Sequence, residues 1–172
     1  MASPVVERSA RVWKPGAQVS MVSGLPIVDA DGEDCGLWVV AAHGGAGATS
    51  WARLLSAGDA GVSWPRPVSV TRAVVVARSS LVGLQAAQVA AIQWASGQVA
   101  GVELVGLILG ADAPGRMPKD LVDLRRRVAG AYPKVWQVGF QNNWRSHLAW
   151  NTPVCREVGR VLKDISLIRK EV

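Results

Sequence analysis

Residues 43–51 read HGGAGATSW and join three glycines to two hydroxyl side chains. The stretch lies between an apolar run, LWVVAA, and a helix-like run, WARLLSAG. Backbone N–H groups in such a loop, and at the start of the helix that follows, can bind anions such as phosphate. Glycine suits the loop because side chains would block close approach of a ligand to the backbone. The stretch therefore indicates either a phosphate-binding loop or an ordinary strand-to-helix turn, and both interpretations stay open.

The first interpretation names a set of nucleotide-binding residues. They are the loop residues and one acid that follows a later apolar run: Gly44, Gly45, Gly47, Thr49, Ser50 and Asp112. Under the second interpretation Thr49 and Ser50 cap a helix, and Asp112 is a turn residue before Pro114. The loop contains no lysine. We expect His43 to form a local hydrogen bond rather than to replace a cation at low pH.

Aromatic and arginine side chains are expected at the same edge of the fold. Those that indicate a protein-binding surface are Trp51, Arg78, Arg116, Trp144, Arg145 and Trp150. Tryptophan and arginine are enriched among the residues that contribute most to protein–protein binding. The alternative is that the tryptophans cover the open end of a sheet and the arginines are solvated surface residues.

The elements that must position these residues alternate along the chain. Four apolar runs, at residues 36–42, 72–77, 102–109 and 134–139, have the pattern of strands buried on both faces. Helical patterns lie between them: one capped by Ser79 or Ser80, one opened by Pro118, and a last one that starts at Thr152-Pro153. This alternation predicts an α/β fold, a three-layer Rossmann-like (P-loop NTPase-like) architecture with a mostly parallel sheet of four or five strands and helices on both faces. We expect residues 1–35 to form a poorly ordered or surface-draped arm and residues 36–172 to form one domain.

Composition limits the class of protein. The chain has 172 residues, 49% of them hydrophobic, which is typical of one packed domain rather than of a disordered chain. No apolar window approaches the roughly 20 residues of a membrane helix, and the N-terminus lacks the apolar core of a signal peptide, so we expect a cytoplasmic protein without a membrane span. Two cysteines and two histidines show no metal-ligand spacing. The net charge of +6 permits DNA binding through Arg125–Arg127, although those arginines also suit a solvated helix face.

The glycine stretch resembles the deviant P-loop of the ParA/MinD class of ATPases, KGGxGK[ST][ST]. The glycines and both hydroxyl residues match that pattern, whereas His43 and Ala48 stand where the family has its two lysines. A hydrogen bond to a charged group contributes about 1.5–3 kcal/mol. The missing lysine at position 48 alone therefore implies an affinity for a triphosphate that is roughly ten- to a hundredfold lower. No apolar strand that ends in a carboxylate precedes RAVVVARSS, and Asp59 is the acid that this part of the chain offers. The resemblance therefore implies a fold without the magnesium-holding acid of the family.

The later segments also resemble this class. RAVVVARSSLVGLQAAQVAAIQWA is similar to its strand and following helix, VELVGLILGADAPGR to its next strand and loop, and VWQVGFQNNWRSHLAWNTP to its late strand and turn. In the second of these, Gly110 or Ala111 replaces the asparagine that contacts the base. Together with the loop, these segments also resemble a group of small actinobacterial proteins associated with conjugative or integrated elements.

The resemblance and its departures lead to one hypothesis and two alternatives. The hypothesis is a non-catalytic interaction module with no bound cofactor, which binds a protein partner in a DNA-transfer, partition or secretion system. The first alternative is a nucleotide-binding protein or slow NTPase that holds ATP or GTP with Mg²⁺ at Gly44–Ser50. The second is a basic accessory protein that binds DNA.

Overall fold

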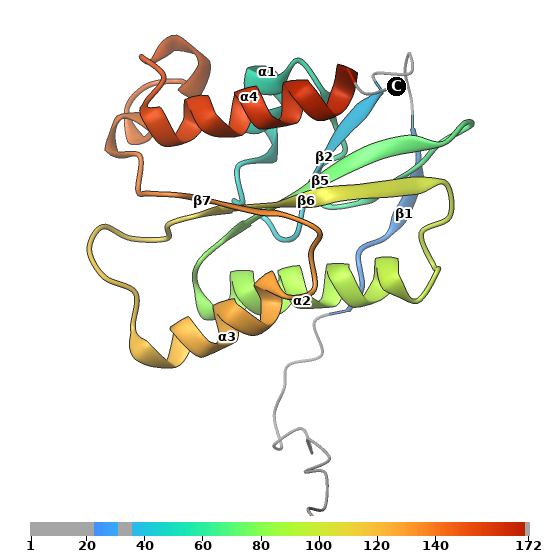
Figure 1. The fold of residues 1–172 in the computed structure, drawn as a ribbon, viewed down its shortest axis with the longest axis horizontal. Helices are drawn as coiled ribbons and strands as arrows, with labels where there is room; N and C mark the ends of the chain where they lie inside the picture. The colour runs from blue at the N-terminus through green and yellow to red at the C-terminus, as the bar shows by residue number, and fades with distance from the viewer. Residues whose placement is uncertain (1–22, 31–35, 171–172) are drawn as a thin grey trace, which may run out of the picture.

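A five-stranded parallel sheet forms the middle layer of the protein (Figure 1). The structure is a computed structural model that describes residues 23–30 and 36–170. The strand order is β3-β2-β5-β6-β7, and each neighbouring pair is parallel. The strands are β2 (Leu37–Ala41), β3 (Gly58–Asp59), β5 (Thr71–Arg78), β6 (Val102–Gly110) and β7 (Val135–Val138). The four predicted apolar runs are β2, β5, β6 and β7.

Helices cover both faces of this sheet, as Figure 1 shows. One face is covered by α1 (Ala48–Leu55) and α4 (Arg156–Lys170), and the other by α2 (Leu81–Ala95) and α3 (Lys119–Ala129). Two short 3-10 helices, η1 (Asn142–Arg145) and η2 (Ala149–Asn151), connect β7 to α4. The predicted three-layer, Rossmann-like α/β fold is therefore confirmed.

The strands bury alternate residues in two separate cores. In β2, Val39 faces the core beneath α1 and α4, whereas Val40 faces the core beneath α2 and α3. Successive side chains of a strand point to opposite faces, so a strand covered on both sides must be apolar at every position. All five residues of β2 are buried accordingly.

A register shift in β6 interrupts this alternation. Leu104 and Leu107 are three residues apart, yet both belong to the core beneath α2 and α3. The pairing of β5 with β6 shifts between Ala73 and Val74, which accommodates the extra residue. A Cβ atom at Gly106 would clash with the carbonyl oxygen of Lys134. Glycine is therefore required where β7 approaches the bulged strand.

A short N-terminal strand adds a second, smaller sheet. β1 (Ile27–Asp29) pairs in parallel with β4 (Trp64–Arg66). Gln93 of α2 is buried and holds both segments, because its Oε1 accepts the N–H of Leu25 at 2.9 Å and the indole N–H of Trp64 at 3.1 Å. Its amide group donates to the carbonyl oxygen of Leu25 at 2.8 Å.

Residues 1–22 and 31–35 of the predicted arm lie outside the described residues, and the boundary at residue 36 stays a prediction.

The helix termini agree with the sequence signals at two of three places. Ser80 is the N-cap of α2, and its hydroxyl accepts the N–H of Gly83 at 3.1 Å. Pro118 precedes α3 directly. The last helix, expected from Thr152-Pro153, begins instead at Arg156. The hydroxyl of Thr152 donates to the carbonyl oxygen of Ala149, which closes η2 and leaves Thr152 extended.

The helix α2 is uncharged and apolar on its outer side as well. Leu81, Val82 and Ile92 are exposed there. At about 1.5 Å per residue its 15 residues span less than the roughly 30 Å of a bilayer core. In the part of the chain that the structure describes, no helix has the length and apolar character needed to cross a membrane.

The carboxylate of Asp164 links α4 to the edge strand β7. It accepts the ammonium of Lys134 at 2.7 Å and the indole N–H of Trp136 at 3.0 Å. The hydrogen bonds from Lys134 and then from Trp136 lower the pKa of Asp164 below its ordinary value. Charged Asp164 therefore contributes to docking of α4 on the sheet.

The close approach at Gly106 predicts a large loss of stability on substitution. We expect Gly106→Ala to lower the free energy of unfolding by about 1–3 kcal/mol, because the added methyl group overpacks the contact between β6 and Lys134. Gly159→Ala is the matched control: its Cβ would lie 3.6 Å from Val154, and alanine is favoured over glycine in a helix by up to about 1 kcal/mol. Urea unfolding measures both variants. An equal effect of the two substitutions would contradict the packing argument.

The lowered pKa of Asp164 predicts an acid-dependent stability. Because the folded-state pKa lies below the unfolded value, the stabilising contribution is complete above about pH 4 and is lost as the pH falls through the folded-state pKa. Asp164→Asn should therefore be less stable than the wild type at neutral pH, and the difference should shrink in acid. Thermal unfolding between neutral and acidic pH measures this. A difference that does not change with pH would show that the charge of Asp164 is not the cause.

Candidate functional site

The candidate site lies where β2 ends and α1 begins. The parallel pairing of β2 with β5 brings Ala41 beside Val76, so the two strands end at the same edge of the sheet. Ligands of open α/β sheets bind outside this carboxyl edge. The glycine loop therefore occupies the position that the sequence predicted for it.

His43 ties the loop to the neighbouring strand. Its Nε2 atom accepts the N–H of Arg78 at 3.0 Å, and its Nδ1 atom lies 2.8 Å from the carbonyl oxygen of Gly44. The neutral Nδ1–H tautomer satisfies both contacts, since Nε2 is then the acceptor and Nδ1 the donor. A Cβ atom at Gly83 would clash with the carbonyl oxygen of Arg78 and lie 3.0 Å from His43 Nε2. His43 thus holds the end of the loop against β5, and Gly83 allows α2 to start there.

Two glycines set the backbone form of the loop. Gly45 and Gly47 have φ angles of 78° and 100°, values at which only glycine is unstrained. Gly47 is the N-cap of α1, and no side chain caps the helix. Thr49 and Ser50 therefore lie inside the first turn of α1 and are not its caps. Ala48, where the resembled ATPases have a lysine, is buried.

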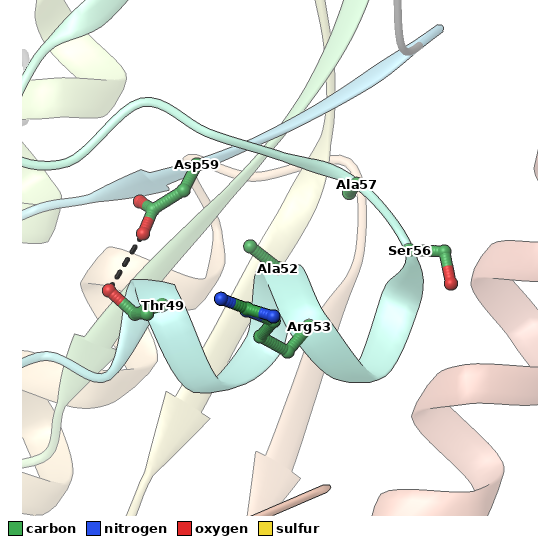
Figure 2. A pocket seen from close by; sticks show the side chains of 6 residues that line it. All are labelled: Thr49, Ala52, Arg53, Ser56, Ala57 and Asp59. Atoms are coloured by element: carbon green, nitrogen blue, oxygen red, sulfur yellow. Dashed lines mark hydrogen bonds between the residues drawn. The ribbon is translucent and has the colours of Figure 1, made fainter.

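Asp59 reaches the first turn of α1 from the edge strand β3. Its Oδ2 atom accepts the hydroxyl of Thr49 at 2.7 Å, and its Oδ1 atom accepts the N–H of Gly61 at 2.9 Å. Figure 2 shows the first of these bonds. A carboxylate near a helix N-terminus is stabilising by about 0.3–1 kcal/mol because it faces the positive end of the helix dipole. Asp59 supplies this charge, since α1 has no acidic residue in its own first turn.

The sequence did not reveal this use of Asp59. The strand β3 has two residues, too few for any hydrophobic period, and it pairs with β2 at Trp38 and Val39. A Cβ atom at Gly58 would lie 2.5 Å from the ring of Trp38, so the close approach of β3 needs that glycine. The Gly-Asp pair directly after the helix pattern is the one signal that could have indicated the strand.

A pocket of about 290 Å³ lies beside α1 (Figure 2). Polar and small residues of α1, of β3 and of the short connection between them line it: Thr49, Ala52, Arg53, Ser56, Ala57 and Asp59. It extends along the flank of the helix and includes none of the loop glycines. Two opposite charges, Arg53 and Asp59, therefore face this pocket without forming a direct ion pair among the described residues.

The remaining nucleotide-site candidate lies at the end of β6. The N–H of Asp112 donates to the hydroxyl of Ser79 at 3.1 Å, and the side chain of Asp112 is exposed. The guanidinium of Arg78 donates to the carbonyl oxygen of Ala111 at 3.2 Å. Arg78 therefore joins the ends of β5 and β6. Arg116 is exposed in the turn that follows.

The tryptophans proposed as a partner surface divide into buried and exposed groups. Trp51 is 3% exposed and packs edge-on against half-buried Trp144, with ring centroids 5.7 Å apart. Trp51 therefore helps to close the end of the core beneath α1 and is not available for direct contact. Trp150 is exposed, and the guanidinium of Arg53 lies 5.5 Å from the centroid of its ring. Arg145 is exposed in η1.

Apolar side chains surround this exposed tryptophan in the sequence. Leu148 is 54% exposed and Val154 is 53% exposed, and both lie within four residues of Trp150. We call Arg53, Arg145, Leu148, Trp150 and Val154 the Arg53–Trp150 surface. Arg53 and the two apolar residues were not part of the predicted surface. They became recognisable only once their exposure was known.

Metal-ligating side chains do not gather in the described part of the chain. Residues 23–30 and 36–170 contain no group of three or more histidine, cysteine, aspartate or glutamate side chains that could hold a metal ion. Two oxygen-bearing side chains beside the loop, those of Thr49 and Asp59, bond to each other.

Comparison with known proteins gives one match. Searches of the curated proteins and of the solved structures gave none. A profile described as a family of unknown function, DUF6668, matches residues 35–162. The matched range covers about three quarters of the chain and includes the glycine loop, the whole five-stranded sheet and the first part of α4. The chain therefore belongs to the DUF6668 family.

Proposed function

We propose that the protein is a non-catalytic interaction module that binds a protein partner through the Arg53–Trp150 surface. The observation that carries the proposal is the exposed contact between the guanidinium of Arg53 and the ring of Trp150, at 5.5 Å. Such a contact contributes about 0.5–1 kcal/mol in water and about 2 kcal/mol or more once it is desolvated. A partner that covers Trp150 therefore strengthens an interaction that is already formed.

The exposed apolar residues support the same surface. Leu148, Trp150 and Val154 are exposed within a single seven-residue segment. Large exposed apolar patches mark interaction sites. Trp144, from the same connection between β7 and α4, packs on Trp51 and so ties this connection to α1. A preformed surface of this kind binds without a large ordering cost.

The chemistry of the loop supports a role without catalysis. Phosphoryl transfer requires cations placed at the developing charge. Here His43 is engaged with Arg78 and Gly44, and Ala48 is buried. The charged side chain that bonds to the first turn of α1 is the acid Asp59 of β3. We propose further that the partner belongs to a DNA-transfer, partition or secretion system, an assignment that rests on the resemblance of the sequence to the ParA/MinD class.

A second candidate function is nucleotide binding at the glycine loop. The observation that favours it is the Thr49–Asp59 pair, because a hydroxyl and a carboxylate beside a helix N-terminus are ligands that Mg²⁺ accepts. The Asp59 carboxylate would then replace the magnesium-holding acid of the resembled ATPases. The absence of a lysine from the loop implies that such binding is weak.

The Arg53–Trp150 surface predicts a loss of partner binding on truncation. Affinity capture from the source cells, followed by quantitative mass spectrometry, should identify proteins that wild type retains and Trp150→Ala loses. Val82→Ala, which removes an exposed apolar side chain on the opposite face of the sheet, is the matched control and should retain them. With the purified partner, Trp150→Ala should raise Kd by at least about 30-fold, corresponding to a hot-spot contribution of about 2 kcal/mol. Equal retention by both variants would contradict the proposed surface.

Titration with Mg-ATP and Mg-GTP separates the two candidate functions. A ligand at five times its Kd adds about 1 kcal/mol to stability and raises the melting temperature. If the protein is a non-catalytic module, we expect no shift at several-millimolar nucleotide. A shift that needs Mg²⁺ and disappears in Asp59→Asn, but persists in the control Asp123→Asn, would establish the nucleotide-binding alternative instead. Asp123 is an exposed acid of α3 on the other face of the sheet.

A further inference from the structure

The outward face of α4 carries a basic stripe. Four cationic residues and one leucine occupy it, at spacings of four, three, four and three residues: Arg156, Arg160, Lys163, Leu167 and Lys170. All five are exposed, because Val158, Val161 and Ile165 on the opposite side of the helix are buried against the sheet. Figure 1 shows α4 lying with α1 over one face of the sheet. The spacing places the four cations in one row about 21 Å long.

The acids of α4 do not neutralise this stripe. Glu157 accepts the N–H of Gly139, and Asp164 accepts Lys134 and Trp136, so both carboxylates turn toward the β7 side of the helix. Asp164 pairs with Lys134, and its interaction with Arg160 of the stripe is a weaker electrostatic one without an ion-pair contact. Among the residues that the structure describes, none of the four cations of the stripe forms an ion pair. The outward face of α4 therefore carries a net positive charge, with Leu167 between Lys163 and Lys170.

We propose that this stripe binds the phosphate backbone of duplex DNA. Each DNA strand places a phosphate about every 3.4 Å along the helix axis, so a row of about 21 Å lies alongside roughly six phosphates. Exposed arginine and lysine side chains contact such phosphates and release condensed counterions. Contacts to phosphates carry no sequence information directly, so binding through them is independent of DNA sequence.

Two other anionic partners fit the stripe less well. An interfacial helix inserts its apolar face into a membrane, but the apolar face of α4 is occupied by the sheet, and Leu167 is the one exposed apolar residue on the stripe. Single-stranded nucleic acid binds through bases stacked on aromatic rings, and the stripe contains no aromatic residue. The charge pattern therefore favours a duplex.

This assignment differs from the basic cluster that the sequence suggested. In α3, Arg125 donates to the side-chain oxygen of Gln137 at 2.6 Å, and Arg126 pairs with Asp123 at 3.3 Å. Two of the three arginines at 125–127 are thus engaged within the protein. The stripe on α4 also shares no residue with the Arg53–Trp150 surface, so the two proposals can fail separately.

The test compares two triple variants that remove the same charge. The first is Arg156→Gln/Arg160→Gln/Lys163→Gln in the stripe, and the second is Lys119→Gln/Arg126→Gln/Arg127→Gln on exposed positions of α3. Fluorescence anisotropy with a short labelled duplex DNA measures Kd over a range of salt concentrations. Circular dichroism and melting temperature check that both variants fold. The wild type should bind with a steep salt dependence, and the stripe variant should lose about 2.7 from the slope of log K against log salt concentration, since each phosphate contact contributes about 0.9.

The outcomes decide the proposal. The assignment is supported if the α3 variant keeps the wild-type salt slope and the stripe variant shows a smaller one. Equal losses in both variants would show that net charge alone is responsible and would overturn it, as would the absence of salt-dependent binding in wild type. Vesicles of phosphatidylcholine and phosphatidylglycerol, and single-stranded DNA, serve as competitors. Preference of the wild type for either competitor over the duplex would also overturn the assignment.

Discussion

The parallel pairing of β2 with β5 is the constraint on which the candidate site depends. Both strands are buried on both faces, so their register is fixed by two cores at once and a slip of one residue would exchange the contents of those cores. This register places the carboxyl ends of β2 and β5 side by side at one edge of the sheet. There, His43 links the two strand ends by accepting the N–H of Arg78. The glycine loop leaves the sheet from this fixed point. Its shape is therefore a consequence of packing beneath it, and the loop keeps that shape without the lysines of a nucleotide-binding protein.

Burial on two faces also explains which parts of the fold the sequence could predict. Strands covered on both sides are continuous apolar runs, and β2, β5, β6 and β7 were recognisable for that reason. The cap at Ser80 is a local hydrogen bond, so nearby residues are enough to predict it. The strands β1, β3 and β4 have two or three residues each and depend on distant partners, such as the side chain of Gln93, which no local pattern contains. The glycine at position 106 is likewise required by the approach of Lys134, which directly precedes β7.

The candidate site was predictable to the same extent. Glycine spacing located the loop, because positive φ angles at Gly45 and Gly47 are a local property of the backbone. The partner of Thr49 could not be found in this way, since Asp59 reaches it from a two-residue edge strand that no apolar run indicates. The role of Trp51 was also open, because a tryptophan after a loop can cover a core or face solvent. Its contact with Trp144 depends on η1, which lies more than 90 residues further along the chain.

The charges of the layer formed by α1 and α4 are divided between two places. At the start of α1 the charged side chain is an acid, which already interacts with the positive end of the helix dipole. A polyphosphate at the loop would meet this carboxylate directly, and without a bound cation the two would repel each other. The exposed cations lie elsewhere, on the outer face of α4 and above Trp150. Because surface charges act over roughly a Debye length of 8–10 Å, the charge beside the glycine loop and the charge on the outer face of α4 act on different surroundings. One layer of the fold therefore combines an acidic helix start with a basic outer helix face.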